Sequence, residues 1–172
     1  MSLSHVDGSG RARMVDVGGK PSSVRTALAT GVIRMSPAAL SLVEENSGPK
    51  GHVLTTAELA GVAAAKRTSE LIPLCHPVPL DHVRVVAIAD RSVGGVRIEA
   101  EVKAEGKTGV EMEALTAVTA ALLTVYDMVK AAGHTMEIGE VRLLEKTGGT
   151  RGDWRRQPDS QLFHEDMKRG RE

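Results

Sequence analysis

Apolar residues recur at helical spacing through the stretch from Lys107 to Lys130. The repeating positions are Leu115, Val118, Leu122, Val125 and Val129. Side chains three and four residues apart share one face of a helix, so this stretch predicts a long helix that packs on a core. Thr108 and Glu111 have the spacing of a capping box at its start. Gly133 follows the last apolar position, where a left-handed glycine commonly ends a helix.

Alternating apolar residues and turn residues predict the strands. Extended segments are expected over residues 22–35, 83–89, 96–104 and 136–146, with a hairpin turn over 90–95. Because the second and third segments are joined by a short turn rich in glycine, they should pair antiparallel in one sheet.

Two further helices are predicted between the first two strands. Ser36 followed by Pro37 is a typical helix start, and this short helix should end near Glu45. A second capping box, Thr55 with Glu58, opens an alanine-rich helix. The complete order is βαββαβ with an inserted short helix. We therefore expect an α+β, ferredoxin-like sandwich with an antiparallel sheet and helices on one face.

The chain of 172 residues is expected to form one domain over residues 1–153. Residues 1–20 are rich in glycine, serine and arginine and predict a mobile arm with one short strand at 14–17. Residues 154–172 are a polar tail.

Composition narrows the class of protein. Only 2% of the residues are aromatic, so the chain has little surface on which nucleic-acid bases could stack. Lys and Arg together number 22, as do Asp and Glu, so no bulk positive charge favours nucleic acid or a membrane surface. The single Cys75 fits a reducing compartment, and the N-terminus lacks the apolar segment of a signal peptide. We expect a soluble, cytoplasmic protein.

Asp127 lies off the apolar stripe, on a helix face of small and polar residues. The other members of this face are Glu113, Thr116, Ala120, Thr124 and Ala131. Lys130 follows three residues later, within ion-pairing distance. Two interpretations are open. The pair is an exposed salt bridge, which contributes little, or it is a proton-transfer pair whose pKa values partial burial has moved towards neutrality.

The spacing of Glu113 and Asp127 constrains any site that uses both. They share a face but lie about 21 Å apart along the axis, at 1.5 Å per residue. One helix cannot bring both to a small substrate, so a second chain must supply one of them. We therefore expect a symmetric homo-oligomer.

Other polar residues have both functional and structural interpretations. Lys50 precedes the alanine-rich helix and is either part of an anion site or a solvated loop lysine. Lys66 and Arg67 end that helix, where the helix dipole alone would favour cations. His76 lies between proline-containing turns, as a site residue or as a satisfied loop histidine.

Motifs for metals and cofactors are lacking. Cys75 and His76 are neighbours with no second Cys/His pair at ligand spacing, so no metal site is predicted. Lys107 and Thr108 follow a glycine as in a phosphate-binding loop, but Glu101 occupies the position of the required first glycine.

Several longer motifs resemble a known family. They are Met14–Val17, Lys50-Gly51, Ala64–Thr68, Leu71–His76, Lys107–Thr116 and Tyr126–Met128. The chain resembles the molybdenum cofactor biosynthesis protein C family, the cyclic pyranopterin monophosphate synthases, from about residue 5 to residue 153. Leu-Cys-His combined with Thr-Gly-Val-Glu-Met-Glu-Ala-Leu-Thr at this separation is far more specific than any one short motif.

The resemblance implies an activity and an assembly. The family converts (8S)-3′,8-cyclo-7,8-dihydroguanosine 5′-triphosphate to cyclic pyranopterin monophosphate with release of pyrophosphate, a lyase reaction of molybdenum cofactor biosynthesis that yields a pterin. It also implies a ferredoxin-like fold in a homohexamer, a trimer of dimers with sites at subunit boundaries.

The resemblance also implies residue roles. Asp127 and Lys130 would be the acid/base pair, with Lys50 beside them and His76 and Glu111 in the pocket. The segments that contact substrate in the family correspond to Leu74, Cys75, His76, Met112 and Glu113. Lys66 and Arg67 would be basic residues on the phosphate side of the substrate. No cofactor is implied, although magnesium could accompany the triphosphate.

One position departs from the family pattern. The family usually has aspartate after Lys-Gly, whereas this chain has His52.

An alternative function is a non-catalytic subunit that binds a nucleotide or pterin on the same fold. Such a subunit would need the basic residues but would tolerate the loss of Asp127.

Overall fold

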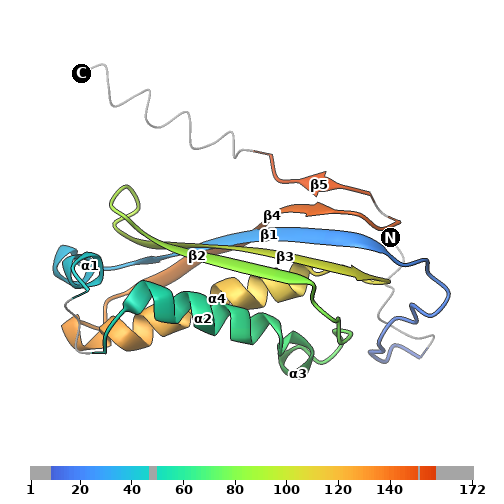
Figure 1. The fold of residues 1–172 in the computed structure, drawn as a ribbon. Coiled ribbons are helices and arrows are strands. Elements are labelled where there is room, and N and C mark those ends of the chain that lie inside the picture. The colour runs from blue at the N-terminus through green and yellow to red at the C-terminus, as the bar shows by residue number, and fades with distance from the viewer. Residues whose placement is uncertain (1–8, 47–49, 151, 158–172) are drawn as a thin grey trace, which may run out of the picture.

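The sheet runs the length of the molecule, and two long helices cover one of its faces (Figure 1). The computed structural model describes residues 9–46, 50–150 and 152–157. The strands are β1 (Ser23–Arg34), β2 (His82–Asp90), β3 (Gly95–Gly106), β4 (Glu137–Thr147) and β5 (Trp154–Arg155). They form one antiparallel sheet in the order β2-β3-β1-β4-β5. The predicted ferredoxin-like α+β fold is therefore confirmed.

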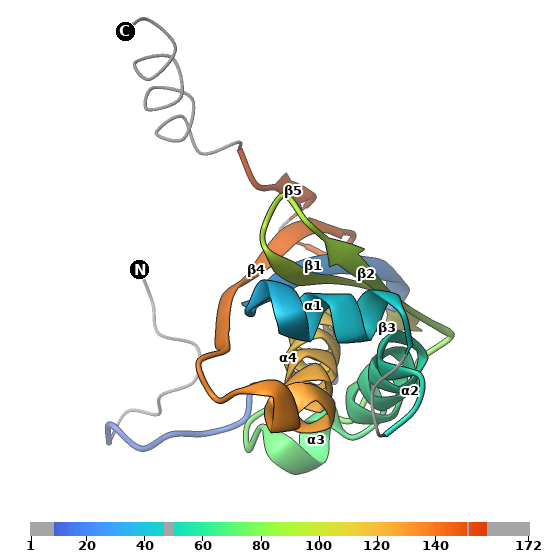
Figure 2. The same ribbon diagram turned by 90° about the vertical axis from the view of Figure 1, so that its left-hand side faces the viewer.

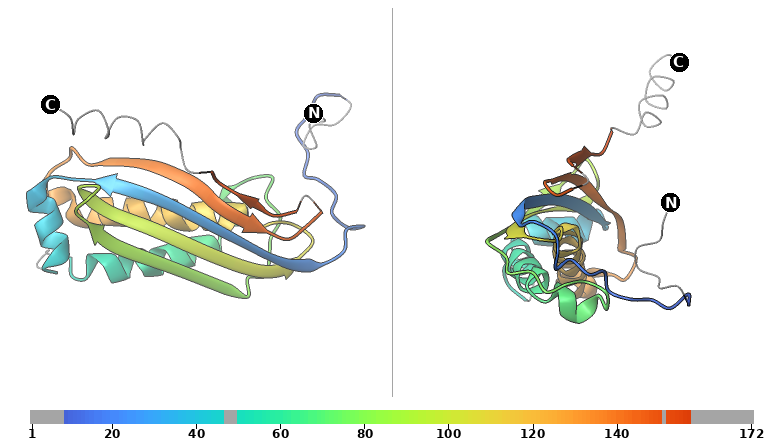
Figure 3. Two further views of the ribbon diagram at one scale, coloured as in Figure 1. Left: turned by 90° about the horizontal axis from the view of Figure 1, so that it is seen from above. Right: turned by 90° about the vertical axis from the view of Figure 1, so that its right-hand side faces the viewer.

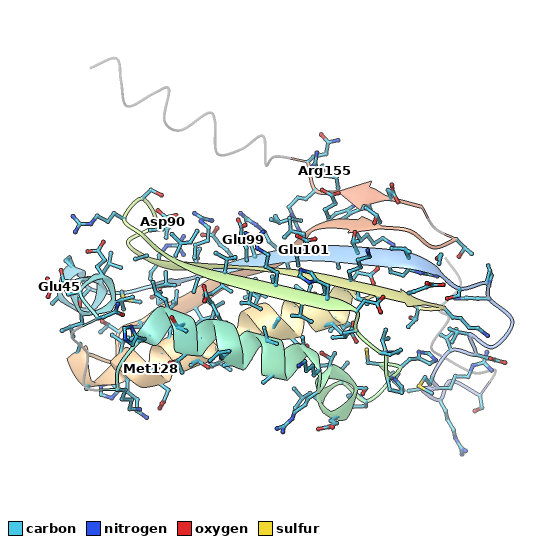
Figure 4. All side chains as sticks on the ribbon, in the orientation of Figure 1. Glu45, Asp90, Glu99, Glu101, Met128 and Arg155 are labelled. Carbon is cyan, nitrogen blue, oxygen red and sulfur yellow. The ribbon has the colours of Figure 1, made fainter. Side chains whose placement is uncertain are left out.

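The helices are α1 (Pro37–Glu44), α2 (Val53–Ala65), α3 (Thr68–Leu71), α4 (Glu111–Val129) and the 3-10 turn η1 (Lys130–Ala132). Seen along the strands, α2 and α4 lie side by side beneath the sheet, with α1 at one end (Figure 2). On the opposite face of the sheet, Glu99 and Glu101 of β3 point away from the helices (Figure 4).

Small residues allow the helices to approach the sheet and each other closely. A Cβ atom on Gly31 of β1 would lie 2.8 Å from side-chain atoms of both Val118 and Leu122 in α4. A Cβ atom on Gly61 of α2 would lie 3.0 Å from the carbonyl oxygen of Ala117. The core is built mainly from Ala, Val, Leu and Ile, and such close contacts allow these small side chains to pack tightly without aromatic rings.

The apolar stripe of α4 packs as predicted. Val118, Leu122, Val125 and Val129 are buried, and Leu115 is half-buried against the same core. With η1, α4 is long and apolar enough to cross a membrane, and it is the one such helical segment in the described residues. Half of that segment is buried within the domain, as in the core helix of a globular protein.

Both predicted capping boxes are wrong. The helix α4 begins at Glu111 after Val110, with no side-chain cap, so Thr108 lies outside it. The Glu111 carboxylate folds back over Gly109, where a Cβ atom would collide with it. The helix α2 begins two residues before Thr55, and Glu58 instead accepts a hydrogen bond from the β2 backbone.

That bond joins Ala87 N to Glu58 Oε1 at 3.0 Å. It satisfies a backbone donor on an edge strand, which a local capping pattern cannot reveal. Ser36 does cap α1, because its Oγ accepts a hydrogen bond from Ala39 N at 3.2 Å. Gly133 has a positive φ of 147° but an extended ψ of 160°, so it ends η1 without the predicted left-handed conformation.

The two chain ends also differ from expectation. Residues 14–17 are irregular rather than a strand, although Ala12 forms an isolated bridge. Trp154 and Arg155 pair with Lys146 and Glu145 of β4, so the first residues of the predicted tail extend the sheet. The remainder of that tail, residues 158–172, lies outside the described residues.

Candidate functional site

Three predicted residues meet at the C-terminal end of α4, and we call them the Lys-Asp cluster: Lys50, Asp127 and Lys130. Lys50 Nζ donates to Asp127 Oδ2 at 2.7 Å and to the Asp127 carbonyl oxygen at 3.0 Å. Lys130 Nζ lies 2.8 Å from Asp127 Oδ1. The loop before α2 and the last turn of α4 are thus joined through one carboxylate.

The charges of the Lys-Asp cluster stabilise one another. Hydrogen bonds from Lys130 and then from Lys50, with their positive charges, lower the pKa of Asp127 to about 2. The same carboxylate raises the pKa of Lys130. Asp127 is therefore a carboxylate and Lys130 an ammonium group at neutral pH. In this state the Lys130 ammonium group can donate a proton, whereas Asp127 can accept one readily only if its lysine partners move away.

The cluster is also exposed, since the Asp127 side chain retains 57% of its accessible surface. The proton-transfer interpretation requires partial burial, and the single chain does not provide it. A ligand or a second subunit would have to cover the cluster.

Five other predicted residues line a cavity of about 520 Å³ at the opposite end of α4, which we call the main cavity. They are Leu74, Cys75, His76, Glu111 and Met112. The first three come from the loop after α3, where Cys75 N donates to the Ile72 carbonyl oxygen at 3.0 Å. The other two belong to the first turn of α4. Pro73 and Pro77 restrict the conformations of that loop, which places His76 among the lining residues.

The main cavity also contains four cationic side chains that sequence reasoning did not select. They are Lys20, Arg25, Lys107 and Lys146. Lys146 Nζ lies 3.5 Å from Glu111 Oε1, so the Glu111 carboxylate has an ion-pair partner instead of a capping role. One sequence signal could have identified Arg25. Arg25 lies two and four residues before the core residues Ala27 and Ala29, so its side chain points to the same, buried face of the strand. An arginine is unusual on such a face.

Glu113 is buried between the main cavity and a smaller pocket. Its side chain is 2% exposed, Oε1 lies 3.8 Å from Cys75 Sγ, and Oε2 has no hydrogen-bond partner among the described residues. Burial raises the pKa of Glu113. Burial and the nearby Glu113 carboxylate raise the pKa of Cys75 to about 11. Cys75 is therefore a neutral thiol and not a nucleophile at physiological pH.

Lys66 and Arg67 lie outside the main cavity. Lys66 lines the smaller pocket of about 200 Å³ together with Glu113, Thr68 and Ser69. Arg67 is exposed at the junction of α2 and α3. The structure thus separates the residues predicted to meet the phosphates from the cation-rich cavity.

The predicted site residues therefore occupy the two ends of α4. Met128, the neighbour of Asp127, lies at the end of the molecule next to α1 (Figure 4). The main cavity is lined by residues that follow α3 and by Arg25 of β1. Both α3 and the start of β1 lie away from α1 in Figure 1, and Figure 3 shows the same sheet from above. Among the described residues, no group of three or more His, Cys, Asp or Glu side chains is placed to hold a metal ion.

Fold and site together define a class of protein: a ferredoxin-like α+β domain that combines a lysine-flanked aspartate with a cation-lined cavity, a set of groups suited to proton transfer on an anionic small molecule. Comparison with known proteins makes this specific. The model of the MoaC family matches residues 14–149. The chain belongs to the MoaC family.

Curated relatives match over nearly their whole length. The cyclic pyranopterin monophosphate synthase of Methylobacterium sp. (strain 4-46) is 56% identical over 91% of this chain and 98% of its own length. The synthase of Methylobacterium nodulans is 57% identical over the same shares. That of Brucella ovis is 52% identical over 88% of this chain and 92% of its own length.

Proposed function

We propose that this chain is a cyclic pyranopterin monophosphate synthase of molybdenum cofactor biosynthesis. It converts (8S)-3′,8-cyclo-7,8-dihydroguanosine 5′-triphosphate to cyclic pyranopterin monophosphate and pyrophosphate, as a lyase. The observation that carries the proposal is the convergence of the family-like motifs. Those before α2 and at the end of α4 meet in the Lys-Asp cluster, and those after α3 and at the start of α4 meet in the main cavity.

The two sites supply the two kinds of chemistry that the reaction needs. Rearranging the guanine-derived ring requires proton transfers, for which the Lys-Asp cluster offers a lysine acid and a carboxylate base. Closing the cyclic phosphate forms a bond from a substrate oxygen to phosphorus and breaks the bond to pyrophosphate, which leaves with the electron pair. Cations stabilise the charge that accumulates on the departing phosphates.

The residues around the main cavity take the roles that family membership implies. His76 and Glu111 act beside the reacting groups, and Leu74, Cys75, Met112 and Glu113 contact the substrate. Glu113 is buried with no cation partner among the described residues, and burial raises its pKa, which favours the protonated form that can donate a hydrogen bond to a substrate nitrogen or oxygen. The reaction needs no resident cofactor, and magnesium, where required, arrives with the triphosphate.

We further propose that the working site is composite and forms between subunits of a homo-oligomer, in the family manner a hexamer built as a trimer of dimers. Glu113 and Asp127 lie about 21 Å apart along α4. The Asp127 side chain is exposed, as expected of a surface that a second copy covers. An enzyme of this kind would work in the cytoplasm.

A direct assay tests the activity. The purified chain is incubated with the cyclic dihydroguanosine triphosphate, and pyrophosphate and the pterin product are measured together. Stoichiometric release of both supports the proposal. Binding of the substrate without either product would instead identify a non-catalytic binding subunit.

Hybrid oligomers test the composite site. Asp127→Asn and His76→Ala chains carrying different tags are co-expressed, and the mixed oligomers are isolated. If each site takes Asp127 from one subunit and His76 from its neighbour, about a quarter of the sites recover both native residues and activity returns in that proportion. Hybrids as inactive as either parent would show that each site lies within one chain.

A further inference from the structure

Glu111 is the one carboxylate among the residues that line the main cavity, and it is the first residue of α4. Side chains on a helix lean towards its N-terminus, so the Glu111 side chain extends back over the residues that precede the helix. The positive end of the helix dipole favours a negative charge at that place. Both effects direct the carboxylate towards residue 109, whatever that residue is.

Gly109 leaves the space that this carboxylate occupies. A Cβ atom on Gly109 would overlap Glu111 Oε2, and it would lie 2.7 Å from Cδ and 2.9 Å from Oε1. Each of these contacts is closer than a Cβ atom tolerates. Gly109 does not have a positive φ, so its backbone conformation alone does not require glycine. What this position requires is the missing side chain.

Lys146 holds the same carboxylate through an ion pair. Its Nζ lies 3.5 Å from Glu111 Oε1. Lys146 stands on β4 and pairs with Ala27 of β1 and Trp154 of β5, so strands on both sides fix its backbone. The Lys146 and Glu111 side chains retain 24% and 31% of their accessible surface, and this partial shielding from water strengthens their attraction. The carboxylate is therefore held between Lys146 and the backbone of Gly109.

We propose that Gly109 is a positioning residue for Glu111: the missing side chain at position 109 creates the space in which Lys146 fixes the Glu111 carboxylate inside the main cavity. Gly109, Glu111 and Lys146 all line that cavity. A carboxylate is an acceptor only, so in this place it can receive a hydrogen bond from an N–H or O–H group of a ligand. The identity of the ligand rests on the proposed function, in which Glu111 acts beside the reacting groups.

A larger residue at position 109 should damage the site rather than the fold. The atoms that an added Cβ would meet are the end of a flexible side chain, which can rotate away. At Gly95, by contrast, an added Cβ would collide with the backbone of Ile33. Gly109→Ala should therefore unfold at nearly the same denaturant concentration as the native chain. Gly106→Ala is the matched control, because Gly106 ends β3, does not line the cavity and has no atom within 4 Å of an added Cβ.

Cys75, the single cysteine of the chain, reports the position of the carboxylate without any substrate. Burial, then the Glu113 carboxyl group and, least, the Glu111 charge raise the pKa of Cys75 to about 11. When the Glu111 charge leaves the cavity, iodoacetamide should alkylate Cys75 roughly twofold faster at pH 9, in Gly109→Ala as in Glu111→Gln. The double variant should react like Glu111→Gln, and Gly106→Ala like the native chain. A native rate in Gly109→Ala would overturn the proposal.

Turnover of the cyclic dihydroguanosine triphosphate tests the consequence for the reaction. Gly109→Ala and Glu111→Gln should each lower kcat roughly tenfold or more, with a smaller change in KM. Because both substitutions act through one carboxylate, the double variant should be no slower than Glu111→Gln alone. Losses that multiply in the double variant would show that Gly109 acts independently of Glu111, against the proposal. A native chain without turnover refutes the proposed function alone, since the alkylation rates still judge the positioning of Glu111.

Discussion

The two ends of α4 present opposite kinds of site. The Lys-Asp cluster is made by three side chains, two of them three residues apart, and it lies exposed with its charges largely paired. The main cavity is assembled from the arm, β1, the loop after α3, the start of α4 and the end of β4, and its charges are unbalanced. Local pairs are simple to form but weak in water. Holding several positive charges together in a partly buried cavity lowers the stability of the folded chain. Binding of an anionic ligand can offset that loss.

The largest effect should come from Asp127→Asn in the Lys-Asp cluster. The substitution is nearly isosteric and removes the titrating carboxylate, so turnover should fall by about 10²–10⁴-fold while substrate affinity changes little. Separate measurements of pyrophosphate release and of substrate binding check this. Near-normal turnover would reduce the cluster to a surface ion-pair group and leave all the chemistry to the main cavity.

Gly149→Ala should damage the main cavity without touching the cluster. Gly149 has a φ of 83°, and an added Cβ would meet the Arg25 guanidinium. Strain and overpacking of this kind cost about 1–3 kcal/mol. The variant should unfold at lower denaturant and bind pyrophosphate more weakly. Gly152→Ala is the matched control, because it has a similar φ of 69° but no atom within 4 Å of the added Cβ.

Lys66→Ala distinguishes the two groups of basic residues. Lys66 lies outside the main cavity, so its loss should weaken substrate binding by less than the loss of Lys107, with a smaller salt dependence. Substrate titrations at two ionic strengths measure both quantities. If Lys66→Ala weakens substrate binding more than the loss of Lys107 does, the phosphates bind at the end of α2, as the family resemblance implies.

Glu113→Gln tests the effect of burying a carboxyl group beside the main cavity, in contrast to the exposed carboxylate of Asp127. Burial raises the pKa of Glu113 above its unfolded value, so the folded state retains the proton when the unfolded state has lost it. This group therefore lowers stability as pH rises from about 4.5 towards its folded pKa. Glutamine is neutral throughout, so the variant should be at least as stable as the native chain at pH 7, with the difference shrinking below pH 4. Thermal unfolding across that range checks the sign.

His52→Asp should have the smallest effect. His52 is the N-cap of α2, with extended backbone and no side-chain cap bond. Aspartate can accept from the first turn and favours the helix dipole, so the variant should gain roughly 0.5–1 kcal/mol in unfolding free energy. Turnover should be nearly unchanged, because Lys50 contacts Asp127 directly. A marked change in turnover would mean that residue 52 tunes the cluster.

The sequence by itself determined the elements and their class. Alternating and helical apolar patterns located β1 to β4 and the long helix α4, since these periods follow from backbone geometry. It also identified the Asp127 and Lys130 pair, because residues three apart on a helix are neighbours wherever the helix lies. The family motifs marked the loop at Cys75 and His76 and the start of α4.

Only the tertiary structure decided what those elements bring together. Glu58 looks like half of a capping box, but it bonds to Ala87 of the edge strand, a partner 29 residues away. Lys50 meets Asp127 across 77 residues of sequence. The cavity cations come from segments as distant as Lys20 and Lys146, and Arg25 is buried there because β1 passes beneath the turn at Gly149. Periodicity reports which face of an element is buried, whereas contacts between distant segments depend on how the whole sheet and its helices pack.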